Sequence, residues 1–318
     1  MKKVEKLADN IYLIDGFDLN MPDRTGTYVL TESELTIIET SASPSVPYII
    51  DGLHELGFSP KDIKYIIVTH IHLDHAGGAG LILEQCPEAK VIVHPKGKRH
   101  LADPSRLIAG ARAVYGDKFD SLFDPLIPIP EDRLIEKNDQ ETLIISEDCT
   151  LTFYDTPGHA NHHFSIHHPK VNGMFTGDTV GIRYSTLLEE GVEFYLPSTS
   201  PNQFDPNKML ASIELCKSLN LSGIFFGHYG LSKNPNEVYK QVAFWLNKFI
   251  EAGKKGYSEG TTFEEQAQIT AEELIQKVTL HLEELGVSRT HEVHNVLKLD
   301  MEVSSMGLID YLHKQNHL

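Results

Sequence analysis

Hydrophobic residues in the first three quarters of the chain fall into short runs that polar turns separate. Runs of this length that are rich in β-branched residues predict buried strands. The predicted strands cover residues 10–14, 25–30, 35–39, 63–68, 90–94, 143–145, 151–154, 164–166, 173–176 and 224–226. Because three strands precede the first predicted helix, the pattern indicates layered sheets rather than a simple alternating parallel sheet.

Helical spacing of hydrophobic residues marks a few segments before residue 235 and most of the chain after it. Four of the predicted helix starts pair a capping side chain with a proline or a glutamate of the first turn, at Ser45, Asp103, Asp205 and Thr262. The last predicted helix runs from about Val293 to Leu312. We therefore expect a strand-rich domain of residues 1–234 and a helical region of residues 235–318.

Residues 95–130 have the character of an insertion between two strands. A helix is predicted from Asp103 to Gly116, and a connector rich in proline and large hydrophobic residues follows it. Two interpretations stay open at this point: a packed surface excursion, or one wall of a substrate pocket.

The composition is that of an ordinary soluble globular protein, with 41% hydrophobic and 23% charged residues among 318. No hydrophobic run approaches the length of a membrane span, and the N-terminal segment lacks the hydrophobic core of a signal peptide. Cys86, Cys149 and Cys216 are widely separated and form no Cys-x-x-Cys pair. We expect free thiols, a cytoplasmic location and no association with membranes.

The chain is acidic, with a net charge of −17 from 45 acidic and 28 basic side chains. Nonspecific binding to a nucleic-acid backbone depends on a basic surface. We therefore expect no nucleic-acid partner and interpret the excess of acidic groups as a solvated surface.

The densest group of candidate ligands lies between residues 69 and 78. His70, His72, Asp74 and His75 follow a predicted buried strand and precede a glycine-rich turn. Side chains two residues apart in an extended chain point the same way, so His70 and His72 would face one point in space. Asp74 and His75 lie beyond the strand end and can face a second point. The group therefore indicates two neighbouring metal ions rather than one.

The same arrangement returns three times later in the chain, where a strand ends at a glycine that is followed by a histidine or an aspartate. The residues in question are His159, Asp178 and His228. One such case would be weak evidence, but a constellation of four in order is hard to attribute to chance. Other nearby histidines are expected to support the fold or the ligands rather than bind metal: His94, His162 and His163.

With these residues the chain resembles the metallo-β-lactamase superfamily of hydrolases, over roughly residues 10 to 230. The resemblance implies an α+β fold of four layers, αββα, in which two sheets pack face to face between helices. Residues 1–234 would form this catalytic domain, and the C-terminal helices would be an extension. The resemblance also implies seven ligands: His70, His72 and His159 for a first metal, Asp74, His75 and His228 for a second, and Asp178 as a bridge.

Nitrogen and oxygen ligands without thiolate suit zinc, manganese or iron, and we expect two divalent ions, zinc before the others. Two adjacent cations lower the pKa of a shared water, so that hydroxide forms near neutral pH. We predict a hydrolase that directs this metal-bound hydroxide at an ester, thioester or lactone of a small molecule. Asp74 and Asp178 would be its catalytic carboxylates. A phosphodiesterase and a non-catalytic metal-dependent binding or sensor protein are the alternatives.

Departures from the branches of the superfamily narrow the substrate. True β-lactamases generally lack the bridging aspartate, so Asp178 argues against antibiotic hydrolysis as the native role. Acyl-homoserine lactonases typically carry a tyrosine three residues later, where this chain has Gly181. Oxygen-reducing diiron members have a glutamate in the place of His72. The segments 69–78 and 177–179 resemble glyoxalase II-like thioesterases, so the resemblance is to the glyoxalase II-like and lactonase-like branch.

A long irregular loop is predicted between Asp178 and the helix near Asp205. It begins directly after a metal ligand, where a loop is well placed to cap a pocket. Arg183, Tyr184 and Tyr195 of this loop are candidate substrate residues. The planar fork of Arg183 suits a carboxylate or a phosphate, and a surface salt bridge is the alternative. The hydrophobic faces of the C-terminal helices would pack over the site or build a homodimer.

Overall fold

The computed structural model describes residues 4–316, so the outermost residues of the two predicted domains, 1–3 and 317–318, lie outside it. Contacts divide the chain into two compact units. The first unit consists of the chain up to Asp155, together with His162–Gly177 and Leu221–Lys233. The second unit consists of Thr156–Asn161, Asp178–Asn220 and the chain from Asn234 onward. These units differ from the predicted domains, because the second unit also includes two segments that precede residue 234. The division into domains of residues 1–234 and 235–318 stays a prediction.

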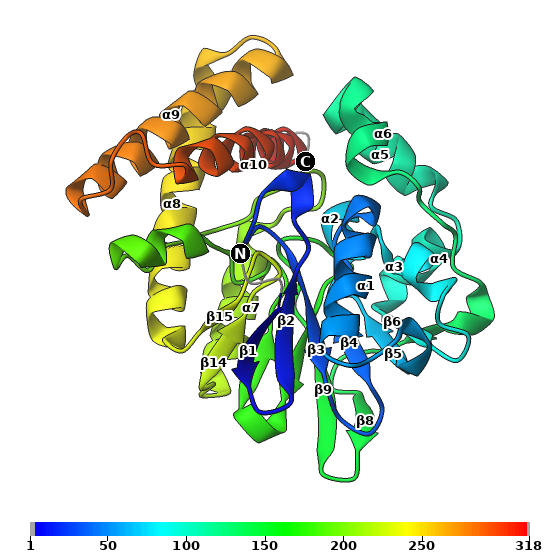
Figure 1. Ribbon diagram of the computed structural model, residues 1–318. Helices are drawn as coiled ribbons and strands as arrows, with labels where there is room; N and C mark the ends of the chain where they lie inside the picture. The colour runs from blue at the N-terminus through cyan, green and yellow to red at the C-terminus, as the bar shows by residue number, and fades with distance from the viewer. Residues whose placement is uncertain (1–3, 317–318) are drawn as a thin grey trace. The chain divides into compact units, whose positions relative to one another are not determined.

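A seven-stranded sheet forms one layer of the first unit (Figure 1). Its strands, in spatial order, are β1 (Val4–Ala8), β2 (Ile11–Asp15), β3 (Gly26–Leu30), β4 (Thr36–Ile38), β5 (Tyr65–Ile67), β6 (Lys90–Val93) and β7 (Leu134–Glu136). Strands β1 to β4 pair antiparallel, and β4 to β7 pair parallel across helical connections. The sequence pattern missed β1 and β7, because half-exposed edge strands carry no continuous hydrophobic run.

A six-stranded sheet forms the next layer of the first unit. Its strands, in spatial order, are β15 (Leu231–Ser232), β14 (Gly223–Phe225), β11 (Gly173–Phe175), β10 (Phe164–His168), β9 (Cys149–Asp155) and β8 (Thr142–Ser146). Strands β11 and β14 pair parallel, and the other neighbours pair antiparallel. The predicted strand of residues 164–166 is longer in the structure, because His167 and His168 extend β10 and pair with β11.

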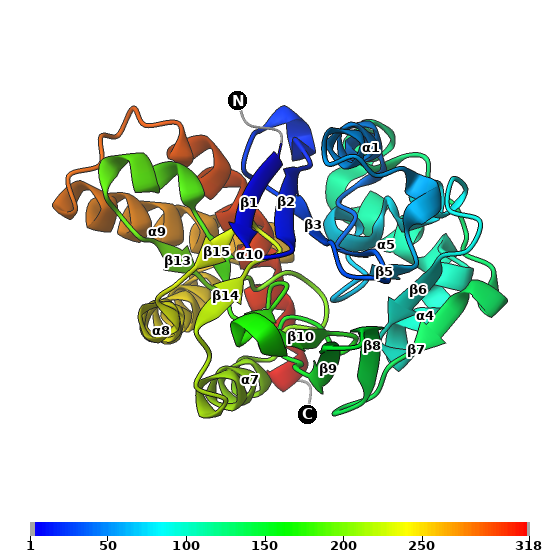
Figure 2. The same ribbon diagram turned by 60° about the horizontal axis from the view of Figure 1, so that its bottom comes forward.

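The two sheets pack face to face, and alternate residues of the first sheet take part in different hydrophobic cores. Ile66 belongs to a core shared with helices, whereas its neighbour Ile67 belongs to the core between the sheets. Successive side chains of a strand point to opposite faces, so a strand buried on both faces is hydrophobic throughout. In Figure 2, helix α1 (Val46–Glu55) lies on the opposite side of the first sheet from β8, β9 and β10.

The other helices of the first unit are α2 (Leu73–Ala76), α3 (Ala79–Leu83), α4 (Pro95–Ala102), α5 (Ser105–Tyr115) and α6 (Phe119–Phe123). Short 3₁₀ turns lie at residues 18–20, 43–45, 60–62, 116–118, 131–133, 169–171 and, in the second unit, 185–190. The predicted helix from Asp103 to Gly116 is α5. Helix α4 was not predicted, and the ring of His94 caps it by accepting a hydrogen bond from the Lys96 N–H at 3.1 Å. This contact confirms a structural role for His94.

The second unit is mainly helical. It contains β12 (Ile182–Arg183), β13 (Tyr195–Leu196), α7 (Pro206–Ser218), α8 (Pro235–Glu259), α9 (Phe263–Glu284) and α10 (Val293–Asn316). The three C-terminal helices pack against one another and confirm the predicted helical extension (Figure 1, yellow to red). The expectation of an irregular loop after Asp178 is wrong in part, because β12 and β13 pair antiparallel within it.

The structure bears on two further predictions, free thiols and the absence of a membrane-spanning segment. Cys86, Cys149 and Cys216 are all buried and free, as expected. Among the described residues, no helix has both the length and the hydrophobicity needed to cross a membrane. The cytoplasmic location stays a prediction.

Candidate metal centre

The predicted motif lies in the first unit, directly after β5. His70 and His72 precede α2, and this single-turn helix carries Asp74 and His75. Thr40 holds the turn in place, because its backbone N–H and its hydroxyl both donate to the carbonyl oxygen of His75, at 2.8 and 2.9 Å. The short helix is thus fixed to the chain that follows β4.

A buried carboxylate that the sequence analysis did not single out orients two of these histidines. Glu39, which follows β4, accepts a hydrogen bond from the Thr69 hydroxyl and lies 3.5 Å from Nδ1 of His75. Since the hydroxyl proton of Thr69 goes to Glu39, the Thr69 oxygen accepts the Nδ1–H of His70 at 3.0 Å. Nε2 of His70 is therefore left with the lone pair that a metal ligand needs.

Glu39 also has an unusual backbone conformation. Its φ angle is +66°, in the left-handed region that residues other than glycine rarely adopt. Strained backbone of this kind clusters at functional sites. In the sequence, Glu39 is an acidic residue at the end of a hydrophobic strand. The hydrophobic pattern alone did not distinguish it from an ordinary turn residue.

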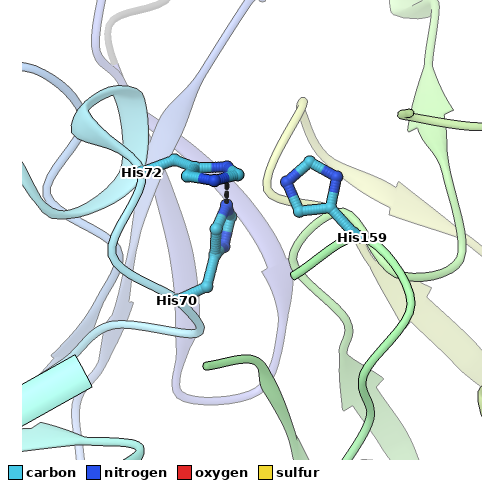
Figure 3. A group of neighbouring side chains, drawn as sticks. All are labelled: His70, His72 and His159. Atoms are coloured by element: carbon cyan, nitrogen blue, oxygen red, sulfur yellow. Dashed lines mark hydrogen bonds between the residues drawn. The ribbon is translucent and has the colours of Figure 1, made fainter. Parts of the chain in front are cut away.

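His70 and His72 form a close pair of ring nitrogens. Nε2 of His70 lies 3.1 Å from Nδ1 of His72 (Figure 3). Two nitrogen ligands of one tetrahedral zinc ion lie about 3.3 Å apart, given Zn–N bonds of about 2.0 Å. The pair therefore has the spacing of two ligands on one ion. Figure 3 also draws His159, which belongs to the second unit.

A second group in the first unit consists of Asp74, His75 and His228. One potential ligand atom from each lies within 4.8 Å of the others. Oδ2 of Asp74 lies 3.7 Å from Nε2 of His75 and 3.4 Å from Nε2 of His228. The Tyr28 hydroxyl fixes the turn of His228, because it lies 2.6 and 2.9 Å from the carbonyl oxygens two residues before and two residues after it.

In the second unit, His159 and Asp178 lie side by side. Nδ1 of His159 donates to the carbonyl oxygen of Ser198 at 3.1 Å, so its Nε2 carries the lone pair that a metal ligand needs. That Nε2 lies 3.7 Å from Oδ2 of Asp178, which also accepts a hydrogen bond from the Ser198 hydroxyl at 3.1 Å. Both ring and carboxylate are buried.

Gly177, directly before Asp178, ties the end of β11 to the Glu39 network. Its φ angle is +47°, and a Cβ at this position would lie only 2.4 Å from the Thr69 hydroxyl oxygen. A larger residue would displace the hydroxyl that orients His70. The glycine noted in the sequence beside the aspartate is therefore required by close packing.

The donor set fits divalent metal ions, because buried imidazoles with defined tautomers and buried carboxylates are their usual protein ligands. The structure groups the predicted ligands within each unit, with five in the first unit and two in the second: His70, His72, Asp74, His75 and His228, then His159 and Asp178. Together, these seven predicted ligands are named the candidate metal centre.

The connection from β2 to β3 contains a feature that the sequence analysis missed. Four of its residues other than glycine have φ angles between +46° and +59°: Phe17, Leu19, Asn20 and Asp23. Within it, the buried Asp18 carboxylate pairs with Arg24 at 3.1 Å. Burial raises the pKa of Asp18, Arg24 opposes this, and the negative charge of Asp74 raises the pKa further. Asp18 is therefore within electrostatic reach of Asp74.

Two of the three predicted supporting histidines, His162 and His163, lie against the motif within the first unit. The His162 ring stacks on the His70 ring at an interplanar angle of 8° and a centroid distance of 6.3 Å. The His163 ring centroid lies 5.1 Å from that of His70. Both rings are buried, so they help to fix the orientation of His70.

The three candidate substrate residues lie in or beside the small sheet of β12 and β13. Tyr184 is buried, and its hydroxyl donates to Oδ2 of Asp300 in α10 at 2.9 Å. Tyr195 is buried as well, and Arg183 pairs with it in register. The hydroxyl of Tyr184 is thus already bound by the chain. Substrate binding by these residues stays a prediction.

Known proteins resemble this chain in sequence. The Metallo-beta-lactamase superfamily matches residues 22–228. The metallo-beta-lactamase fold-containing protein ST1585 of Sulfurisphaera tokodaii is 27% identical over 238 residues, which cover 73% of this chain and 84% of ST1585. The N-acyl homoserine lactonase AttM of Rhizobium radiobacter is 32% identical over 117 residues, which cover 37% of this chain and 40% of AttM.

Solved structures resemble it in fold. The crystal structure of ST1585 has a TM-score of 0.64 at 22% identity and covers 94% of this chain and 98% of its own. The metallo-beta-lactamase family protein TTHA1429 from Thermus thermophilus has a TM-score of 0.67 at 18% identity, with 97% and 95% covered. These similarities confirm the predicted α+β fold class. Since the family match runs through more than half of the chain, from residue 22 to His228, this protein belongs to the metallo-β-lactamase superfamily, whose members are generally metal-dependent hydrolases.

Proposed function

We propose that this protein is a two-metal hydrolase that cleaves an ester, a thioester or a lactone of a small molecule. In this proposal, His70, His72 and His159 would hold one divalent ion, Asp74, His75 and His228 would hold the other, and Asp178 would contact both. Such ions, when bound, supply an acidified water and polarise the carbonyl oxygen of the substrate. Zinc is the first candidate, with manganese and iron as alternatives.

The observation that carries the proposal is the way hydrogen bonds within the chain orient these side chains. Glu39 and Thr69 select the tautomer of His70, and the Ser198 carbonyl selects that of His159. Orientation of imidazoles by carboxylates, hydroxyls and carbonyls is typical of working metal sites.

Asp74 has a second role in the proposal, as the group that passes a proton to the leaving group. It is the most exposed of the Asp74, His75 and His228 group, with 29% of its side chain accessible against 1% and 6%. A carboxylate that is both accessible and next to the ligands is well placed for proton transfer. The partial similarity to AttM, a lactonase, supports including lactones among the substrates tested.

The test combines metal analysis with a substrate panel. Protein purified without added metal would be analysed for metal content and assayed on a carboxylic ester, a thioester, a lactone and a phosphodiester. We expect about two ions per chain, as a binuclear site requires, and turnover on one of the first three. A chelator should abolish turnover, and zinc, manganese or iron should restore it.

Asp178→Ala should abolish turnover, and Asp132→Ala, which changes an exposed aspartate away from the ligands, should not. Turnover on the phosphodiester alone would replace the proposal with the phosphodiesterase alternative. A protein that binds metal but hydrolyses none of the four classes would favour a binding or sensor role. Metal content near zero, without activity after metal is restored, would exclude the two-metal hydrolase altogether.

A further inference from the structure

A second group of potential metal ligands lies in the first unit, and it shares no residue with the candidate metal centre. Glu32, Cys149 and His168 each offer one ligand atom, and the three atoms lie within 4.8 Å of one another. Their position on the fold, their burial and the spacing of their ligand atoms indicate what the group could bind.

The group lies at the far end of the second sheet from the histidine motif. Strand β9 has seven residues, so Cys149 at its start is about 20 Å from Asp155 at its end, given a rise of about 3.3 Å per residue. Asp155 pairs with Phe164, whose backbone N–H donates to the carbonyl oxygen of Thr69 in the motif. Cys149 is therefore remote from the candidate metal centre.

Three separate elements supply the three side chains. Glu32 belongs to the turn between β3 and β4, Cys149 opens β9 and His168 closes β10. Figure 1 shows the β3–β4 turn (blue) beside β8 and β9 (green). The N–H of Glu34 in that turn donates to the carbonyl oxygen of Ile145 in β8 at 2.9 Å. The group thus joins the two sheets at one edge of the sandwich.

The three side chains are withdrawn from solvent. Cys149 and His168 are fully buried, and 5% of the Glu32 side chain is accessible. Sγ of Cys149 lies 3.5 Å from Nε2 of His168. Zn–S and Zn–N bonds of about 2.3 and 2.0 Å place two such ligand atoms about 3.5 Å apart on one tetrahedral ion, so Sγ and Nε2 have the spacing of a ligand pair.

We propose that Glu32, Cys149 and His168 bind a thiophilic divalent cation such as Zn²⁺, at a site distinct from the candidate metal centre. Thiolate, imidazole and carboxylate are all ligands of zinc, and three protein ligands leave one position for water. On binding, the sulfur–metal bond replaces the S–H bond, and the proton passes to solvent. The cation would clamp the β3–β4 turn to the ends of β9 and β10.

The protonation states of the free group agree with this chemistry. Burial raises the pKa of the Cys149 thiol to about 11, so the thiol keeps its proton until a cation displaces it. Burial lowers the pKa of His168 to about 4, so the ring is neutral at pH 7, as ligation requires.

Lys170 is the internal competitor for this site. Its ammonium nitrogen lies 3.0 Å from each carboxylate oxygen of Glu32 and 2.8 Å from Oδ1 of Asp148. The Lys170 side chain is 29% accessible, so its end can move toward solvent while it keeps Asp148. A bound cation would take the place of Lys170 on Glu32, and removal of the lysine should strengthen cation binding.

Cobalt provides a readout that the candidate metal centre cannot give. Full-length protein stripped of metal would be titrated with Co²⁺ and followed by absorbance. A thiolate-to-cobalt charge-transfer band requires a cysteine ligand, and the candidate metal centre has none. We expect the band in the wild-type protein, its loss in Cys149→Ser, and its displacement by Zn²⁺. This result is independent of any hydrolytic activity, so the two proposals fail separately.

Matched variants decide between the outcomes. Cys86→Ser and Cys216→Ser alter the other two buried thiols and should keep the band. Lys170→Met should develop it at a lower Co²⁺ concentration than the wild type. No band in the wild type, or a band that survives in Cys149→Ser, overturns the proposal. If circular dichroism finds Cys149→Ser unfolded, Lys170→Met decides instead, because an unchanged titration would exclude Glu32 as a ligand.

Discussion

Glu39 is a single residue on which the orientation of two proposed ligands depends, because it accepts from Thr69 and faces Nδ1 of His75. Glu39→Gln replaces one carboxylate oxygen with an amide NH₂ group, which donates hydrogen bonds and cannot accept them. The Thr69 hydroxyl, which donates to Glu39, would then face another donor. We expect metal affinity to fall about 10–100-fold, the range typical for partners of metal ligands. Competition with a chromophoric chelator would measure it. Glu55→Gln, an exposed position in α1, is the control. Equal affinities in both variants would contradict the assigned role.

Asp15 makes the stability of the protein depend on pH. Its carboxylate accepts the N–H groups of Phe17 and Asp23 at 2.9 and 3.1 Å, but burial outweighs these bonds and raises its pKa to about 6. The unfolded value is about 3.9. The folded protein therefore holds this proton more tightly, and the contribution of Asp15 to stability falls as the pH rises from about 4 to about 6.

Urea unfolding of the wild type and Asp15→Asn across this range would isolate the effect, since the variant lacks the titrating group. From pH about 4 to about 7, the wild type should lose about 2–3 kcal/mol of unfolding free energy relative to Asp15→Asn. This follows from a pKa difference of about 2 and 1.36 kcal/mol per pKa unit. A difference that stays constant with pH would show that Asp15 has an ordinary pKa.

At the scale of elements, the pairing of β12 with β13 depends on Gly181. Its φ angle is +93°, and a Cβ there would lie 2.5 Å from the carbonyl oxygen of Leu196 in β13. Gly191 has a similar φ of +73°, but no atom beyond its chain neighbours lies within 4 Å of a Cβ there. We expect Gly191→Ala to cost about 1–2 kcal/mol from left-handed strain alone. Gly181→Ala should cost more, because the β13 strand must move. Thermal unfolding of both variants tests this, and equal losses would count against the packing argument.

At the scale of the whole molecule, the question is whether the C-terminal helices can be removed. Within the second unit, the Tyr184 hydroxyl donates to Asp300 and the Thr199 hydroxyl donates to the carbonyl oxygen of Ser304, each at 2.9 Å. Both bonds link α10 to the segment that begins with Asp178. That segment therefore depends on residues far beyond position 234.

We expect a chain that ends at residue 234 to melt at a lower temperature and to bind less metal, because the surroundings of Asp178 would be lost. Circular dichroism and elemental analysis of residues 1–234 beside the full chain would measure both. Unchanged melting and metal content would instead support an independent domain of residues 1–234.

The sequence by itself determined the local features of this protein. Hydrophobic runs placed most strands, capping residues placed α7 and α9, and the spacing from His70 to His75 marked the motif. These features are local, because side-chain direction and helix capping depend on residues a few positions apart. Edge strands such as β1, with little buried surface, left no comparable signal.

Only the tertiary structure decided which distant residues meet. In the folded chain, Glu39 contacts Thr69 and lies beside His75. Asp18 lies near Asp74, and Cys149 lies beside His168 and Glu32. Nothing in the spacing of these residues indicates contact, because each pair is joined only by the register and packing of separate strands. Local periodicity records which face of an element is buried, but contacts between elements depend on how the whole chain packs.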